Sequence, residues 1–221
     1  MLTLFSCHKT EKVQVYDLKV ESLVNPLGLE QKQPRLSWKL HSEERGVHQQ
    51  AYRIIVSSSE EKLKENVGDL WDSGRIPSSE TVLIPYEGAP LSGRQFCYWK
   101  VRIETNLGEV VSSERAFWSM GLEASDWQAK WIGLGSIEAE GEDRKMNFVP
   151  ENEDELRLKS ETRLRARYLR KVIKLGKDVK SAMLYISGLG LYEAYLNGHK
   201  IGDQVLAPTP TDYSKTVPYN T

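Results

Sequence analysis

Alternation of apolar and polar residues dominates the first half of the chain. In "PRLSWKL" the apolar Leu36, Trp38 and Leu40 alternate with polar neighbours, and "AYRIIVSSS" and "QFCYWKVRIE" repeat the pattern. A period of two residues is that of a β-strand with one buried face. Several such segments, separated by turn residues, predict an antiparallel β-sandwich over residues 15–121.

Two segments of this region differ from the alternating strands. "TVLIPY" is short and reaches Pro85, which suits an edge strand or a strand end. "SSEEKLKENVGDLW" has a helical composition around Leu63, and it is either one short helix or a polar loop. Trp38 and Trp99 are expected to face each other in the core between the two sheets.

Residues 122–167 interrupt the β pattern. "SDWQAKWIG" carries Trp127 and Trp131, which either plug a domain junction or form a platform for stacking on sugar. Residues 134–167 are polar and charged, as in an exposed linker. Their carboxylates are poor candidates for a general acid, because a solvated charge run offers nothing to raise a pKa.

The β pattern resumes at residue 168. "YLRKVIKL" and "SAMLYISGLG" alternate, and "LYEAYLNGHKIG" predicts a hairpin with a type I′ turn at Asn197-Gly198. Only about four strands follow before Thr221, and a lone sheet of that size leaves one face uncovered. We therefore expect residues 168–221 to be an incomplete second β-domain.

Composition excludes several functional classes. The 221 residues have a net charge of −1, which leaves no broad electrostatic footprint for nucleic acid or an anionic membrane. No segment is long enough to span a bilayer. The histidines are dispersed without metal-ligand spacing, and the G-x-G of "GLGLYEAYLNG" leads into a strand, so a dinucleotide site is not expected.

The two cysteines have different contexts. Cys97 lies in a strand-like run and is expected to be a free, buried thiol. Cys7 follows a short apolar run in "MLTLFSC", where Leu4 and Ser6 fit the lipobox of bacterial lipoproteins. Residues 1–14 are therefore either a truncated signal with Cys7 as the lipidated residue or a disordered N-terminus.

A family resemblance extends over nearly the whole chain. "VESLVNPLGLEQKQPRLSWKL", "GDLWDSGRI", "FCYWKVRIETNLGE", "SDWQAKWIG" and "AMLYISGLGLYEAYLNGHKIGDQVLAPTPTDYSKTVPY" occur in the order found in the N-terminal region of bacterial α-L-rhamnosidases. The resemblance implies an all-β architecture, with a fibronectin type III-like or immunoglobulin-like sandwich followed by part of a jelly-roll domain. In this family a C-terminal α/α toroid carries the acidic residues that hydrolyse terminal α-L-rhamnose with inversion.

None of those catalytic positions has a counterpart in this sequence, so no catalytic residue is assigned. The expected partners are the missing C-terminal catalytic domain and a rhamnose-containing glycan. A membrane is expected only through the lipid anchor, and the localisation is that of a secreted, periplasmic or outer-membrane lipoprotein of a bacterium. The expected organisation is an N-terminal leader, the sandwich, a junction with a charged linker, and the truncated jelly roll, over residues 1–14, 15–121, 122–167 and 168–221.

Tyrosines of the second domain are the candidate sugar-binding residues, because one face of a pyranose is apolar. Strand alternation places Tyr192 on the apolar face with Ala194 and Leu196, where a core position is expected. Tyr195 lies on the opposite face and is the better surface candidate. Tyr213, in the segment after the hairpin, is the second candidate.

Calcium is the only candidate ion, since some jelly-roll modules of the family bind rhamnose with its help; no other cofactor is required. Calcium prefers oxygen ligands, and Asn197, Asp203 and Asp212 are the candidates. Their alternative roles are structural: Asn197 forms the turn, Asp203 caps a loop and Asp212 forms an Asx-turn.

Three functions remain open at this point. The chain provides accessory modules of an α-L-rhamnosidase, or it is a stand-alone carbohydrate-binding or adhesion module, or it is a structural spacer without a ligand.

Overall fold

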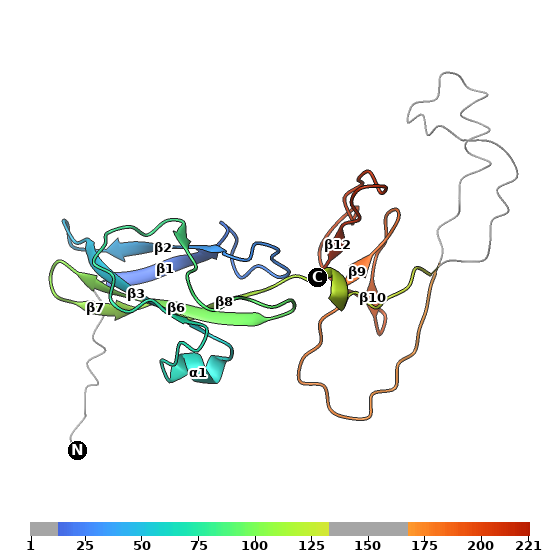
Figure 1. The fold of residues 1–221 in the computed structure, drawn as a ribbon, viewed down its shortest axis with the longest axis horizontal. Coiled ribbons are helices and arrows are strands. Elements are labelled where there is room, and N and C mark those ends of the chain that lie inside the picture. Colours follow the sequence, from blue (N-terminus) through green and yellow to red (C-terminus); the bar gives the residue numbers. More distant parts are fainter. Residues whose placement is uncertain (1–12, 133–167) are drawn as a thin grey trace, which may run out of the picture. The chain divides into compact units, whose positions relative to one another are not determined.

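The computed structural model describes residues 13–132 and 168–221. It divides into two compact units, one formed by Met1–Gln128 with Leu184–Thr221 and the other by Ala129–Met183. The first unit contains every helix and strand of the described residues (Figure 1). Among those residues, no helix combines the length and the apolar composition needed to cross a membrane.

One sheet of the sandwich is antiparallel and three-stranded. Its order is β1 (Val13–Val20), β2 (Arg35–Ser42) and β5 (Ile84–Pro85). β5 occupies an edge and ends at Pro85, as predicted; a proline is tolerated there because it has no N–H to donate to a further strand. The alternation of β2 places Leu36 and Trp38 in the core.

The second sheet has five strands, in the order β4-β3-β6-β7 with β8 also pairing with β6. All of these pairings are antiparallel. The strands are β3 (Gln49–Ser57), β4 (Trp71–Asp72), β6 (Phe96–Thr105), β7 (Val110–Ser112) and β8 (Ala116–Ser119). This sheet faces the first one (Figure 1), which confirms the predicted all-β sandwich.

The core between the sheets is built around large aromatic side chains. Trp38 of β2, Trp99 of β6 and Trp118 of β8 are each at most 1% exposed. Trp38 and Trp99 come from opposite sheets, as the sequence predicts. The core also confirms the expectation for Cys97, a free thiol whose burial raises its pKa to about 12.

The segment with helical composition forms a short helix, α1 (Glu60–Lys64). Ser59 caps it, since its Oγ accepts a hydrogen bond from the Lys62 amide. Leu63 is 2% exposed, so the helix is held by one buried side chain against β3. α1 lies over part of the face of the five-stranded sheet that points away from β1 and β2 (Figure 1).

Residues 184–221 contain two short antiparallel ribbons. β9 (Ile186–Ser187) pairs with β12 (Tyr219–Asn220), and β10 (Tyr195–Leu196) pairs with β11 (His199–Lys200). A single-turn 3₁₀ helix, η1 (Ala124–Asp126), follows the sandwich.

The described residues of the unit Ala129–Met183 contain no helix or strand. The strand predicted from "YLRKVIKL" is therefore wrong for the described structure. Alternation marks residues that suit a strand, but a strand also needs a neighbour that accepts and donates its backbone hydrogen bonds. No described segment pairs with these residues.

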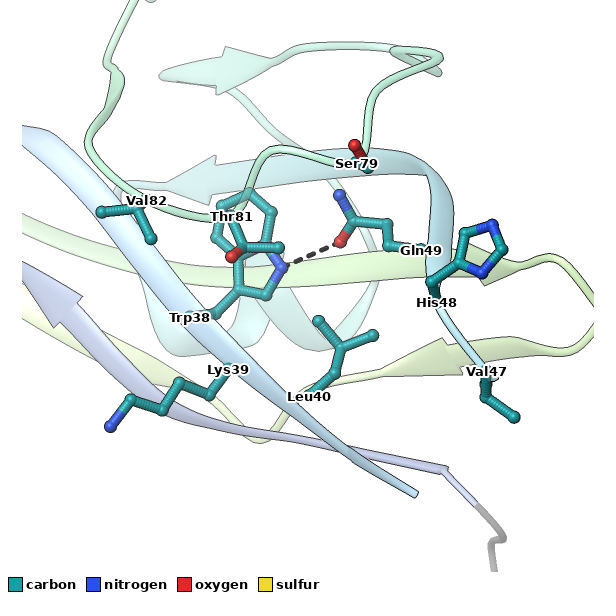
Figure 2. A pocket seen from close by; sticks show the side chains of 9 residues that line it. All are labelled: Trp38, Lys39, Leu40, Val47, His48, Gln49, Ser79, Thr81 and Val82. Carbon is teal, nitrogen blue, oxygen red and sulfur yellow. Dashed lines mark hydrogen bonds between the residues drawn. The ribbon is translucent and has the colours of Figure 1, made fainter. Parts of the chain in front are cut away.

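A buried glutamine, Gln49, hydrogen-bonds one of the core tryptophans. The Trp38 indole N–H donates to Gln49 Oε1 at 3.0 Å, and Gln49 Nε2 donates to the carbonyls of Ser78 and Glu80, each at 2.9 Å. Figure 2 shows the amide of Gln49 directed at the indole of Trp38. By contrast, the indole N–H groups of Trp99 and Trp118 have no partner among the described residues. Gln49 thus accepts the indole hydrogen bond of Trp38 and, through its own N–H groups, holds the loop over residues 78–80 against the sandwich.

Gln49→Ala is expected to lower the free energy of unfolding by about 2–3 kcal/mol, because it leaves a buried N–H and two carbonyls unpaired. Urea unfolding followed by tryptophan fluorescence measures the change. Gln50→Ala is the matched control, since Gln50 is exposed on the same strand, and it should change stability by less than about 0.5 kcal/mol. Equal stability of the two variants would contradict the role assigned to Gln49.

Candidate functional site

The β10–β11 hairpin presents the first candidate sugar-binding tyrosine. Asn197 and Gly198 have φ angles of 51° and 86°, as a type I′ turn requires. Tyr195 is 58% exposed, and its hydroxyl donates to Glu193 Oε2 at 2.8 Å. Lys200 Nζ holds the other oxygen of Glu193, also at 2.8 Å. The ring of Tyr195 is therefore at the surface while its hydroxyl is positioned by a charged neighbour.

The other tyrosines belong to a different network. Tyr192 is half-buried and donates its hydroxyl hydrogen to the Ile186 carbonyl at 3.1 Å. Tyr213 Oη accepts from the Gly190 amide at 3.1 Å. Tyr213 therefore fixes the loop before Tyr192, and its hydroxyl lies outside the Tyr195–Glu193 pair.

The candidate calcium ligands are engaged in local structure. Asn197 occupies the hairpin turn. Asp212 accepts from the Ser214 amide and hydroxyl at 3.1 and 2.6 Å and pairs with Lys215 at 3.0 Å, as in an Asx-turn. Asp203 is exposed. Among the residues that the structure describes, no three His, Cys, Asp or Glu side chains gather to hold a metal, so the calcium site stays a prediction.

Several carboxylates of the β-strands and loops are ion-paired, among them Glu104, Glu193 and Asp212. Arg75 lowers the pKa of Glu104, and Lys200, followed by Tyr195, lowers the pKa of Glu193. Hydrogen bonds from Ser214 and then Lys215 lower the pKa of Asp212. A glycosidase general acid needs a raised pKa. The pKa values of these three carboxyl groups are lowered instead, so none of them has the property of a general acid.

β12 is joined to the end of the sandwich through Tyr219. Its hydroxyl accepts from the Leu122 amide at 2.8 Å, and its ring lies 5.7 Å from that of Trp127 and 6.2 Å from that of Tyr185. Trp127, 37% exposed, thus packs against β12. Of its two predicted roles, this contact favours the junction anchor. We call the set Leu122, Trp127, Tyr185 and Tyr219 the joint.

Two glycines permit this close approach. A Cβ on Gly121 would lie 2.6 Å from Tyr219 Oη. A Cβ on Gly28, whose φ is 73°, would lie 2.8 Å from Thr221 Oγ1. Sequence reasoning missed the joint, because nothing in the alternation pattern says that a tyrosine near residue 220 meets an amide near residue 120.

A hollow of about 730 Å³ lies beside the joint. Amide and hydroxyl groups line it together with apolar side chains, among them Gln204, Asn220, Val205 and Tyr219. None of the predicted sugar or calcium residues contributes to this lining. A smaller hollow of about 350 Å³ lies over Trp38 on the sandwich (Figure 2), where the Gln49 amide is already used by its hydrogen bonds.

Two sequence predictions fall on residues outside the described ranges. Cys7, the lipidation candidate, is one, and the acidic linker over residues 134–167 is the other. The lipid anchor and the localisation therefore stay predictions.

The fold and the joint define a class: an immunoglobulin-like sandwich with a second β-module later in the chain, whose β12 contacts the end of the sandwich. Residues 15–124 match the family model described as the Rha78A-like, N-terminal immunoglobulin domain. Residues 177–221 match that of the α-L-rhamnosidase N-terminal domain. The chain therefore belongs to the α-L-rhamnosidase family, whose N-terminal domains it carries.

Individual relatives agree with this assignment. An α-L-rhamnosidase of Formosa agariphila is 36% identical over 97% of this chain, and that alignment takes up 23% of the relative. A solved α-L-rhamnosidase from Dictyoglumus thermophilum matches 94% of this chain and 23% of its own, with a TM-score of 0.73 and 36% identity. A Streptomyces avermitilis α-L-rhamnosidase, solved in complex with L-rhamnose, matches 55% of this chain and 12% of its own, with 41% identity and a TM-score of 0.51. The chain thus spans about a fifth of the length of the curated relatives it matches.

Tyr219→Phe is expected to speed hydrogen exchange at the Leu122 amide about tenfold, because it removes the acceptor of one partly buried hydrogen bond. Exchange followed by NMR or mass spectrometry measures this. Tyr213→Phe is the control, since it removes the same atom from a hydroxyl that serves Gly190 instead. An unchanged Leu122 exchange rate in Tyr219→Phe would show that the joint does not depend on this bond.

Proposed function

We propose that this chain forms the N-terminal accessory modules of an α-L-rhamnosidase that removes terminal α-L-rhamnose from glycans or glycosides. The supporting observation is the combination of 36% identity over 97% of this chain with a share of only 23% of the matched α-L-rhamnosidase. The catalytic domain then lies in polypeptide outside these 221 residues.

The carboxylates of the described residues are compatible with this division of labour. Inverting hydrolysis requires two carboxyl groups roughly 6.5–9.5 Å apart, one of them kept protonated by its surroundings. Glu104, Glu193 and Asp212 are all paired with cations, which favours the ionised form of each. Their role is to hold local structure.

The accessory role would be to position a sugar chain and the modules that follow. The sandwich is tightly packed, because its three core tryptophans are almost completely buried between the two sheets. The joint ties β12 to the end of the sandwich through one hydrogen bond, from the Leu122 amide, and one ring contact, with Trp127. A binding surface on the second module would thereby be held to the sandwich.

The sugar contact on the second module is proposed at Tyr195, with calcium as an accessory ion. The exposed ring of Tyr195 offers a flat apolar surface to a pyranose. Its hydroxyl lies against Glu193, so a carboxylate stands next to the ring, where sugar hydroxyls would donate.

The 221-residue chain is expected to release no p-nitrophenol from p-nitrophenyl α-L-rhamnoside above the buffer rate. The longer protein encoded by the same gene should hydrolyse the same substrate, because the general acid and base lie in the part absent here. Turnover by the chain alone would contradict the assignment of catalysis to other residues. A gene that stops at this point would favour the stand-alone binding module or the spacer.

Tyr195→Ala is expected to weaken L-rhamnose binding by the longer protein about tenfold, since a stacking contact of about 1–1.5 kcal/mol is lost. Isothermal titration with and without calcium measures affinity and ion dependence together. Tyr168→Ala is the control, since Tyr168 is 99% exposed and belongs to the other unit. Unchanged affinity in Tyr195→Ala would remove this residue from the sugar site, and unchanged affinity after chelation would remove calcium.

A further inference from the structure

The outward face of the five-stranded sheet carries an unusual set of side chains. Along β6, the inward Cys97, Trp99 and Val101 are fully buried. The residues between them point away from the core, because successive side chains of a strand alternate. Phe96, Tyr98, Lys100 and Arg102 therefore stand in a row on the outward face. This row and the side chains beside it are called the outer face.

Three aromatic rings cluster at one end of the outer face. Tyr98 and Phe117 are opposite each other in the pairing of β6 with β8, and their ring centroids lie 6.4 Å apart. Phe96 lies 6.3 Å from Tyr98 in a stacked arrangement and 6.4 Å from Phe117. All three are only half-buried. A core position would bury such large rings fully, so the cluster leaves aromatic surface available to a ligand.

Polar groups border this cluster. The Arg115 guanidinium pairs with Glu60 of α1 at 2.6 Å. Glu60, Arg115 and Glu61 all act electrostatically on the Tyr98 hydroxyl, which makes no hydrogen bond within the described ranges. The rings therefore adjoin a hydroxyl and charged side chains, a mixture that suits polyhydroxylated ligands.

Two cations continue the row beyond the rings. Lys100 is half-buried and Arg102 exposed, and neither has a salt bridge to a described carboxylate. The nearest acids form salt bridges with other cations. Glu104 binds Arg75 at 2.7 Å, although the charge of Arg102 also acts on it, and Asp72 binds Arg53, which is opposite Arg102. Burial and then the charge of Arg102 lower the pKa of Lys100. Like charges side by side on a sheet repel each other. An anion bound between Lys100 and Arg102 would therefore reduce the electrostatic repulsion that these two side chains have in the free protein.

We propose that the outer face binds an acidic polysaccharide, with sugar rings on Phe96, Tyr98 and Phe117 and uronate carboxylates on Lys100 and Arg102. The spacing of these side chains suits a polymeric ligand, because alternate residues of one strand lie about 6.6 Å apart. Along β6 the aromatic rings come first and the two cations follow. The choice of a glycan over an acidic protein rests on the proposed function. The site is not the one proposed at Tyr195, because its residues belong to β6 and β8 of the sandwich, whereas Tyr195 belongs to β10.

Titration of the 221-residue chain with polygalacturonate, and with its fully methyl-esterified form, tests this inference. Binding is expected to the acid only, and it should weaken steeply at about 1 M NaCl, where the Debye length is about 3 Å. The double variant Lys100→Gln/Arg102→Gln should lose affinity about tenfold or more, as charge-assisted hydrogen bonds are removed. Lys174→Gln/Lys177→Gln is the matched control, because both lysines are exposed in the other unit.

Two further variants keep the test sharp. Arg102→Glu reverses one exposed charge without touching the core, so it should abolish binding in a folded protein. Phe117→Leu keeps apolar volume but removes a flat ring, and it should weaken binding several-fold. Polyglutamate, an anion without sugar rings, should bind weakly and respond little to Phe117→Leu.

The proposal is overturned by equal affinity for acid and ester, by unchanged affinity in the charge variants, by absence of binding, or by polyglutamate binding as well as polygalacturonate. Because neither polysaccharide supplies a terminal α-L-rhamnose, these results are independent of the hydrolysis test. Failure of this proposal can therefore be told apart from failure of the proposed function.

Discussion

The structure depends on the burial of Trp38, Trp99 and Trp118 between two sheets. Large rings remove much apolar surface from water, yet each carries an N–H that has to be desolvated. Trp38 recovers this cost through Gln49, whereas Trp99 and Trp118 are buried without a partner in the described structure. One polar side chain thus ties the loop over residues 78–80 to the packing of the whole sandwich. The same packing fixes which side chains of β6 face outward.

The packed sandwich provides the contact site for the second module. The end of β8 leads directly to Gly121 and Leu122, where the lack of a Cβ and a free amide admit Tyr219 of β12. The last strand of the second module is therefore held at a defined place on the first. Under the proposed accessory role such a joint matters, since binding surfaces that act together on a long glycan gain when they are held at fixed separations.

Local patterns were sufficient to predict much of this fold. Alternation identified β2, β3 and β6 because the side-chain period of a strand is written in consecutive residues. The turn at Asn197-Gly198 was predictable because both residues tolerate positive φ. Leu63 resolves the ambiguous segment as a helix, since its burial stabilises a turn that composition alone left open.

Contacts between distant residues were beyond such patterns. The alternation of "YLRKVIKL" is real, but a strand depends on a partner, and no described segment supplies one. Tyr219 and Leu122 are separated by most of the second half of the chain, so no local signal connects them. The sugar and calcium candidates were chosen by residue type, and the structure distributes them over separate local networks, in which Asn197 and Asp212 serve turns.

The central claim is that these modules hold a glycan for a catalytic domain outside this chain. The most direct measurement compares kcat/KM of the longer protein, with and without residues 15–221, on a rhamnose-bearing polysaccharide and on p-nitrophenyl α-L-rhamnoside. The account predicts a much larger loss on the polymer than on the small substrate, because only the polymer reaches the accessory surfaces. Equal losses on both substrates, or no loss on the polymer, would contradict it.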